Sequence, residues 1–337
     1  MIKTSIQKVI DRRDLTRNEA FETMESIMGG EATPAQIGAF LIALRMKGET
    51  PAEIAGFAQS MRNKATKVAT TRTTPLLDIV GTGGDGKHTI NVSTISSFVV
   101  AGAGVTVAKH GNRSVSSKCG AADVLMSLGV NIDLTAEQMS RCLDEVGMAF
   151  LFAPKLHSAM KYAIGPRREI GVRTVFNILG PLTNPAGTTR QLIGVYDKTL
   201  TRLLAEVLQQ LDAEHIWLVH SEDGMDEISL AAKTHVAELK NGKIREFTVE
   251  AGDFGLSPSA ESIVGGDAAE NAQIAREILQ GQKGVKRDVI LANSAASLYI
   301  AGKASDIQEG AKLAAESIDN GAALKMLDNL GTFTQSL

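Results

Sequence analysis

The chain has 337 residues, enough for one large domain or two, and its 44% hydrophobic and 22% charged residues are typical of a packed soluble protein. The formal net charge is −3 and aromatic residues make up 4%, so neither bulk charge nor a stacking surface favours nucleic-acid binding. Cys119 and Cys142 are the only cysteines, which excludes a disulfide framework, and no cysteine–histidine cluster suggests a zinc site.

The amino-terminal residues 1–14 carry charges where a signal peptide needs an apolar run. The longest apolar stretches are interrupted by glycine and fall short of the ~20 residues that a membrane helix requires. The sequence therefore predicts no membrane span, and we expect a soluble, cytoplasmic protein.

The first 65 residues are predicted to be helical, because they contain three capping boxes. Each box pairs a threonine with a glutamate or glutamine three positions later, and the boxes begin at Thr16, Thr33 and Thr50. Proline follows Thr33 and Thr50, at the first helical position, where its missing N–H costs nothing. We expect a small helical domain without catalytic residues, followed by a polar linker at residues 70–75.

Short apolar runs then alternate with helical patterns, which predicts βαβ units and a mainly parallel sheet. A capping box at Thr135 and a helical pattern at residues 199–211 lie between predicted strands. Asn241-Gly242 predicts the turn of a later hairpin. The predicted strands are residues 76–80, 105–108, 149–152, 192–196 and 216–219, the hairpin strands are 235–239 and 244–249, and the closing helices are 268–280, 289–301 and 304–319.

A glycine-rich loop at residues 81–86 follows the first predicted strand and leads into a helix that starts near Ser93 and Thr94. Glycines let backbone amides approach an oxyanion, and a helix N-terminus adds unpaired N–H groups. The loop also satisfies the dinucleotide pattern, but the next strand ends in Lys109-His110 rather than in an acidic residue. His88 occupies the Ser/Thr position of a nucleotide P-loop, so that alternative fails as well. We therefore predict a phosphate-binding loop of another kind.

Two further loops follow predicted strands at the same edge of the sheet. Residues 109–120 contain three permanent cations, a histidine and three serines, which predicts a second phosphate-binding surface. Residues 221–227 contain four carboxylates, which repel one another unless cations neutralise them. Magnesium binds proteins through one or two such carboxylates together with substrate phosphates, so this loop predicts a metal site.

Together these loops resemble the signature segments of the anthranilate phosphoribosyltransferase family, in the same order along the chain. The matching segments are residues 81–85, 109–113, 226–227 and 177–185, and the resemblance extends over essentially the whole chain. It implies a helical domain at residues 1–70, completed by helices within 160–185, and an α/β domain at residues 74–337. The implied fold is similar to that of pyrimidine nucleoside phosphorylases, with a mainly parallel central sheet and the active site between the domains.

The resemblance also implies the ligands and their residues. Anthranilate would contact Gly81, Asn112 and Arg167, and two magnesium ions would be held by Ser93, Asp226 and Glu227. Arg168 is adjacent to Arg167, and the family pattern favours Arg167. Phosphoribosyl pyrophosphate would be bound by Gly81, Gly84, Asp85, Thr89, Asn91, Val92, Ser93, Thr94, Lys109, His110, Gly111, Asn112, Arg113, Ser114, Val115, Ser116, Ser117 and Ala121.

The family implies a homodimer and leaves open an anthranilate synthase partner. Cys119 and Ala121 stand where many relatives carry serines, which would weaken a phosphate contact unless backbone amides replace it. The aromatic amine already has a lone pair, so we expect no obligatory catalytic base, with His110 assisting binding. Two alternatives remain at this stage: a pyrimidine nucleoside phosphorylase-like enzyme, and a non-catalytic relative that binds nucleic acid.

Overall fold

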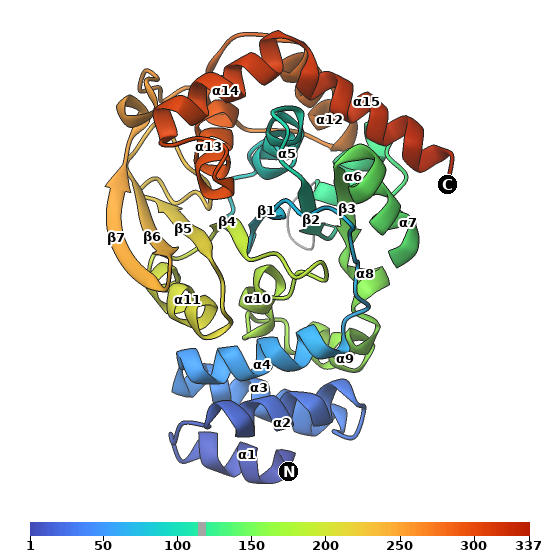
Figure 1. Cartoon of the computed structure of the whole chain (residues 1–337). Helices are drawn as coiled ribbons and strands as arrows, with labels where there is room; N and C mark the ends of the chain where they lie inside the picture. The colour runs from blue at the N-terminus through green and yellow to red at the C-terminus, as the bar shows by residue number, and fades with distance from the viewer. Residues whose placement is uncertain (114–118) are drawn as a thin grey trace.

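The computed structural model describes residues 1–113 and 119–337. The predicted contacts of Ser114, Val115, Ser116 and Ser117 therefore lie outside the described residues. Four helices form the amino-terminal layer, and a seven-stranded sheet flanked by helices forms the rest of the molecule (Figure 1). The predicted fold class, a small helical domain followed by a larger α/β domain, is confirmed.

The helical layer consists of α1 (Ile2–Ile10), α2 (Arg17–Met28), α3 (Pro34–Lys47) and α4 (Pro51–Lys64). All three predicted capping boxes are present, since the Thr16, Thr33 and Thr50 hydroxyls each accept the amide proton three residues on. Farther along the chain, α9 (Lys161–Ile170) packs against α2 and α3. Ala163 and Phe176 belong to the same hydrophobic cluster as the core of these helices.

The sheet contains β1 (Leu77–Gly81), β2 (Val107–Gly111), β3 (Met148–Phe152), β4 (Arg190–Gly194), β5 (His215–Ser221), β6 (Thr234–Lys240) and β7 (Lys243–Val249). Its strand order is β3-β2-β1-β4-β5-β6-β7; the first five strands are parallel, and β6 and β7 form the predicted antiparallel hairpin. From β1 the chain adds β2 and β3 on one side of the sheet, and it then returns to place β4 and β5 on the other side of β1. Ligands in such sheets bind at this reversal, beyond the carboxyl ends of the strands.

Helices cover both faces of the sheet (Figure 1). The core on one face of the sheet contains α5 (Val92–Gly102) and α13 (Val285–Ala301), which contact the strands, and it extends to α6 (Ala121–Ser127), α12 (Ala268–Leu279), α14 (Ile307–Asp319) and α15 (Ala322–Gln335). The other face packs against α10 (Phe176–Leu179) and α11 (Thr199–Gln210), and its core continues into the helical layer. The remaining segments are α7 (Ala136–Arg141), α8 (Ala153–Leu156) and the short turns Cys142–Val146, Ser158–Met160, Gly180–Leu182 and Ala251–Phe254.

Several predicted boundaries shift. The second strand begins at Val107 rather than residue 105, the strand predicted at 192–196 is Arg190–Gly194, and α13 begins at Val285 rather than residue 289. α15 was not predicted. No helix in the described part of the chain combines the length and the apolar character needed to cross a bilayer.

Candidate functional site

The glycine loop and the acidic loop meet at the carboxyl ends of β1 and β4. Gly81 and Gly194 are register partners, and the amide of Thr82 donates to the Gly194 carbonyl at 2.8 Å. The acidic loop crosses directly over this point: a Cβ on Gly194 would lie 1.6 Å from the backbone oxygen of Asp226. Only glycine at position 194 allows this approach, so the sequence of β4 permits the acidic loop to reach the glycine loop.

Three carboxylates converge there. The Gly83 amide donates to Oδ2 of Asp226 at 3.0 Å, and Asp85 lies close enough to raise the pKa of Asp226. Burial is the larger cause, and together they raise the pKa of Asp226 to about 7. Burial and the charge of Asp226 also raise the pKa of Glu227 well above its ordinary value, although the Ser93 amide donates to it. Without a cation, these carboxylates destabilise one another's charged forms.

These oxygens fit a hard divalent cation. Oδ2 of Asp85 is buried and has no hydrogen-bond partner among the described residues. In the same part of the chain, no group of three or more His, Cys, Asp or Glu side chains forms a preformed metal cage. Magnesium usually keeps waters and substrate phosphate oxygens as ligands and uses only one or two carboxylates, so an incomplete protein shell is the expected arrangement.

Lys109 lies behind this cluster rather than in solvent. It is 2% exposed, and its ammonium donates to the Ile79 carbonyl at 2.6 Å and to Ser93 Oγ at 3.2 Å. Burial lowers the pKa of Lys109 to about 8, an effect opposed by the charges of Asp78 and Glu227. Lys109 thus fixes the position of the Ser93 hydroxyl and places positive charge beneath the acidic loop.

The start of α5 is tied to the end of the second loop. Asn91 donates to the Cys119 carbonyl at 3.5 Å, and Asn271 donates to Asn91 Oδ1 at 3.1 Å. Thr89 pairs with Val264 in an isolated bridge, which brings the 263–265 segment against residues 88–90, between the glycine loop and α5. A cavity of ≈ 320 Å³ is lined by this segment, by Lys87 and Thr89, which follow the glycine loop, and by Asp223 and Met225 of the acidic loop. Its size falls in the lower range of small-molecule sites.

Other predicted residues lie farther from the acidic cluster or face elsewhere. Arg113 is exposed and pairs with Asp123 at 3.2 Å. Asn112 is also exposed, and its side chain accepts from the Arg113 amide. Arg167 packs its guanidinium 4.9 Å from the centroid of the Phe176 ring, whereas Arg168 is exposed, so Arg167 is the inward-facing member of the pair.

Two side chains at the site were missed in the sequence. His157 follows α8, and its ring lies 5.1 Å from the ring of His110. Arg173 donates to the carbonyl of Gly84, stacks 4.2 Å from the Tyr196 ring, and accepts a hydrogen bond from Arg45 of α3 at its own carbonyl. Arg173 therefore links the helical layer to the glycine loop. In the sequence, Arg173 is marked only by its position close to Arg167 and Arg168, which does not specify a contact with the glycine loop.

The chain matches known proteins along its whole length. Residues 3–65 match the "Glycosyl transferase family, helical bundle domain" and residues 73–324 match the "Glycosyl transferase family, a/b domain". It is 53% identical over 338 residues to the anthranilate phosphoribosyltransferase of Moorella thermoacetica, covering 100% of this chain and 99% of the relative. It is 51% identical over 348 residues to that of Trichlorobacter lovleyi, covering 99% and 100%.

Solved structures agree with these sequence matches. The anthranilate phosphoribosyltransferase of Thermus thermophilus is 41% identical with a TM-score of 0.92, covering 98% of this chain and 99% of that one. The Saccharomyces cerevisiae enzyme in complex with PRPP and Mg is 28% identical with a TM-score of 0.91, covering 100% and 98%. Both domains, the order of the three loops and these near-complete matches place the chain in the anthranilate phosphoribosyltransferase family of glycosyl transferases.

Proposed function

We propose that this chain transfers the phosphoribosyl group of 5-phosphoribosyl 1-pyrophosphate to the amine of anthranilate, in tryptophan biosynthesis. The products are N-(5-phosphoribosyl)anthranilate and pyrophosphate. Identity of 51–53% over nearly the full length of enzymes that carry this name is the observation that carries the proposal. It disfavours both alternatives, a nucleoside phosphorylase and a non-catalytic nucleic-acid binder.

The proposed substrate sites follow the three loops. The sugar phosphate and pyrophosphate would be bound by the glycine loop, the start of α5 and the 109–117 loop, and anthranilate by Gly81, Asn112 and Arg167. Ser93, Asp226 and Glu227 would hold magnesium, with two ions expected. Relatives support this use of metal and acceptor, since yeast enzyme structures contain PRPP and Mg or 4-fluoroanthranilate.

Charge development explains why these groups suit the reaction. Breaking the bond from the anomeric carbon to pyrophosphate places negative charge on the leaving group and positive charge on the sugar. Bound magnesium would stabilise the leaving pyrophosphate as a Lewis acid. The amides of residues 84–86 and the hydroxyl of Ser93, which Lys109 fixes in position, would be preorganised donors for the same phosphates.

His110 does not have the properties of a general base. Burial, and secondarily the neighbouring His157, lowers the pKa of His110 to about 3, so its ring is neutral at physiological pH and a weak proton acceptor. A neutral imidazole can still position a substrate through a hydrogen bond. We therefore assign His110 to binding and assign catalysis to leaving-group stabilisation and positioning.

The decisive experiment follows anthranilate fluorescence in the presence of magnesium and phosphoribosyl pyrophosphate. We expect a decay that disappears without metal and in Asp226→Asn/Glu227→Gln, because the double substitution removes both carboxylates that would hold the metal. Glu222→Gln is the matched control, since Glu222 is an exposed carboxylate of the same loop. Decay unchanged in the double variant would refute the metal assignment, and no decay with the wild type would refute the reaction.

A homodimer and a cytoplasmic location also belong to this proposal. The helical layer and the adjoining α9 carry exposed apolar side chains on two neighbouring helices: Met46 on α3 is 71% exposed, and Tyr162 and Ile164 on α9 are 39% and 46% exposed. Covering such side chains favours self-association.

A further inference from the structure

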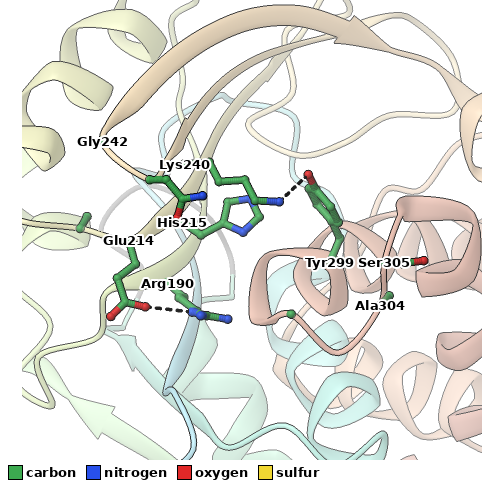
Figure 2. Close-up of a pocket in the computed structure, with 11 residues that line it drawn as sticks. Arg190, Glu214, His215, Lys240, Gly242, Tyr299, Ala304 and Ser305 are labelled. Atoms are coloured by element: carbon green, nitrogen blue, oxygen red, sulfur yellow. Dashed lines mark hydrogen bonds and ion pairs between the residues drawn. The ribbon is translucent and has the colours of Figure 1, made fainter.

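A second cavity lies at the opposite edge of the sheet from the glycine and acidic loops. It has a volume of ≈ 530 Å³ and is bounded by the starts of β4 and β5, the end of β6 and the end of α13 (Figure 2). Because β4 and β5 are parallel and the proposed active site lies at their carboxyl ends, the cavity is separated from that site by the length of the strands.

Two cations face this cavity. The Lys240 ammonium donates to the Tyr299 hydroxyl at 3.0 Å and lies 4.5 Å from the centroid of its ring (Figure 2). Arg190 pairs through Nε with Glu214 at 3.2 Å and donates through Nη1 to the Ala301 carbonyl at 2.6 Å. Nη2 of Arg190 has no hydrogen-bond partner among the described residues.

The neighbouring carboxylates are already engaged. Glu238 accepts hydrogen bonds from His215, Trp217 and Arg245. Glu309 accepts from the amide and hydroxyl of Ser305. Lys240 consequently forms no ion pair within 4 Å in the described part of the chain, although it is half-buried.

A half-buried ammonium without a counter-charge loses hydration that its neutral partner Tyr299 only partly replaces. An oxyanion would restore that loss, and the free Nη2 of Arg190 supplies a second charged donor with the planar geometry that carboxylates and phosphates prefer. Glu214 offers little competition, since its side chain is 56% exposed and its charge is screened by water.

We propose that this cavity binds the phosphate or carboxylate group of a small metabolite between Lys240 and Arg190. The volume of ≈ 530 Å³ falls within the range of small-molecule sites, so it accommodates a body larger than the anionic group itself. Tyr299 forms one wall. The site is distinct from the loops that would hold phosphoribosyl pyrophosphate.

The chain contains one tryptophan, and it reports on this cavity. The ring centroids of Trp217 and Tyr299 are 5.7 Å apart. Inorganic phosphate and sodium acetate would be titrated separately into the full-length protein at constant ionic strength, and Trp217 emission followed. A saturable change with either anion is expected, and the tighter binder identifies which of the two groups the cavity takes.

Lys240→Gln keeps most of the side-chain length but removes the charge, and the dissociation constant should rise roughly tenfold or more. Lys243→Gln, which removes an exposed cation across the hairpin, should leave the constant unchanged. Phosphoribosyl transfer by both variants should match the wild type, because Lys240 lies outside the proposed substrate site. The proposal fails if neither anion gives saturable binding, or if Lys240→Gln binds as tightly as the wild type.

Discussion

Two buried histidines, His110 and His157, share the interior beside the ends of β2 and α8. Burial lowers the pKa of His110 to about 3 and that of His157 to about 4, and each Nε2 lacks a partner among the described residues. In the unfolded chain, histidine titrates near ~6.5. The unfolded state therefore binds protons first as the pH falls, and these two residues stabilise the fold only above that pH.

The contribution of these two histidines to the free energy of unfolding should accordingly fall between about pH 6.5 and pH 4, opposite in sign to that of the buried carboxyl Asp226, whose pKa is raised. Each histidine contributes a slope of up to roughly 1.4 kcal/mol per pH unit in that window. His157→Gln removes one of the two titrating groups. The slope of its unfolding free energy against pH should therefore be smaller than that of the wild type, by close to the contribution of one bound proton. Urea unfolding at a series of pH values measures the slope, and equal slopes in the two proteins would contradict the assignment.

Asp78 of β1 ties β1 to β2, the two strands that precede the predicted phosphate-binding loops. Its fully buried carboxylate accepts from the His110 amide at 3.1 Å, from Asn184 at 2.9 Å and from Gln191 at 3.3 Å. In Asp78→Asn an amide N–H₂ replaces one acceptor oxygen and faces these donors. We expect a loss of about 1–3 kcal/mol of unfolding free energy and a higher KM for phosphoribosyl pyrophosphate.

Asp133→Asn, at an exposed position, is the control for Asp78→Asn and should change neither quantity. Thermal unfolding and steady-state kinetics provide the two readouts. A wild-type KM in a destabilised Asp78→Asn protein would limit Asp78 to a structural role.

At the scale of elements, local chemistry predicted where helices begin. The boxes at Thr16, Thr33, Thr50 and Thr135 all form, because a hydroxyl and a carboxyl-type group three residues apart meet the same unpaired amides in any tertiary context. The missed α15 has no side-chain cap at Gly321. α13 likewise starts after the uncapped Gly284, and its start was misplaced. A helix whose first residue is set by tertiary packing, without a capping side chain, leaves no such local signal in the sequence.

The close approach of the acidic loop to β4 can be tested with one methyl group. Gly194→Ala places Cβ 1.6 Å from the Asp226 carbonyl oxygen, so the loop must move. We expect at least a tenfold loss of magnesium-dependent activity, by analogy with other displaced catalytic groups. Gly252→Ala is the control, since nothing lies within 4 Å of its Cβ. Wild-type activity in Gly194→Ala would mean that Asp226 need not hold its observed position.

For the whole molecule, the two hydrophobic clusters show how the domains are joined. The cluster that contains Phe40 and Phe57 of the helical layer also contains Leu204 of α11 and Leu218 of β5. The helical layer and one face of the sheet thus share a continuous core, and the layer's outer helices remain available for association.

If the exposed apolar side chains on α3 and α9 form the dimer interface, a charged residue placed among them should prevent dimerisation. Met46→Glu should convert a dimer to a monomer in light scattering, because an interface buries few unpaired charges. Met126→Glu is the matched control: Met126 is 39% exposed but lies on α6, away from the helical layer. A dimer that persists in Met46→Glu would exclude this surface as the interface.

The sequence by itself determined the family, the α/β class, the capped helices, the hairpin and the three loops that follow strands. These features depend on residues close together in the chain, where backbone geometry limits the possible arrangements. The strand order, the contact of Arg173 with Gly84, the pairing of His110 with His157 and the Lys240–Arg190 cavity were decided only by the tertiary structure. The last three join residues more than 40 positions apart, and the strand order pairs Leu77 of β1 with Arg190 of β4. The packing of both sheet faces, rather than local spacing, brings those residues together.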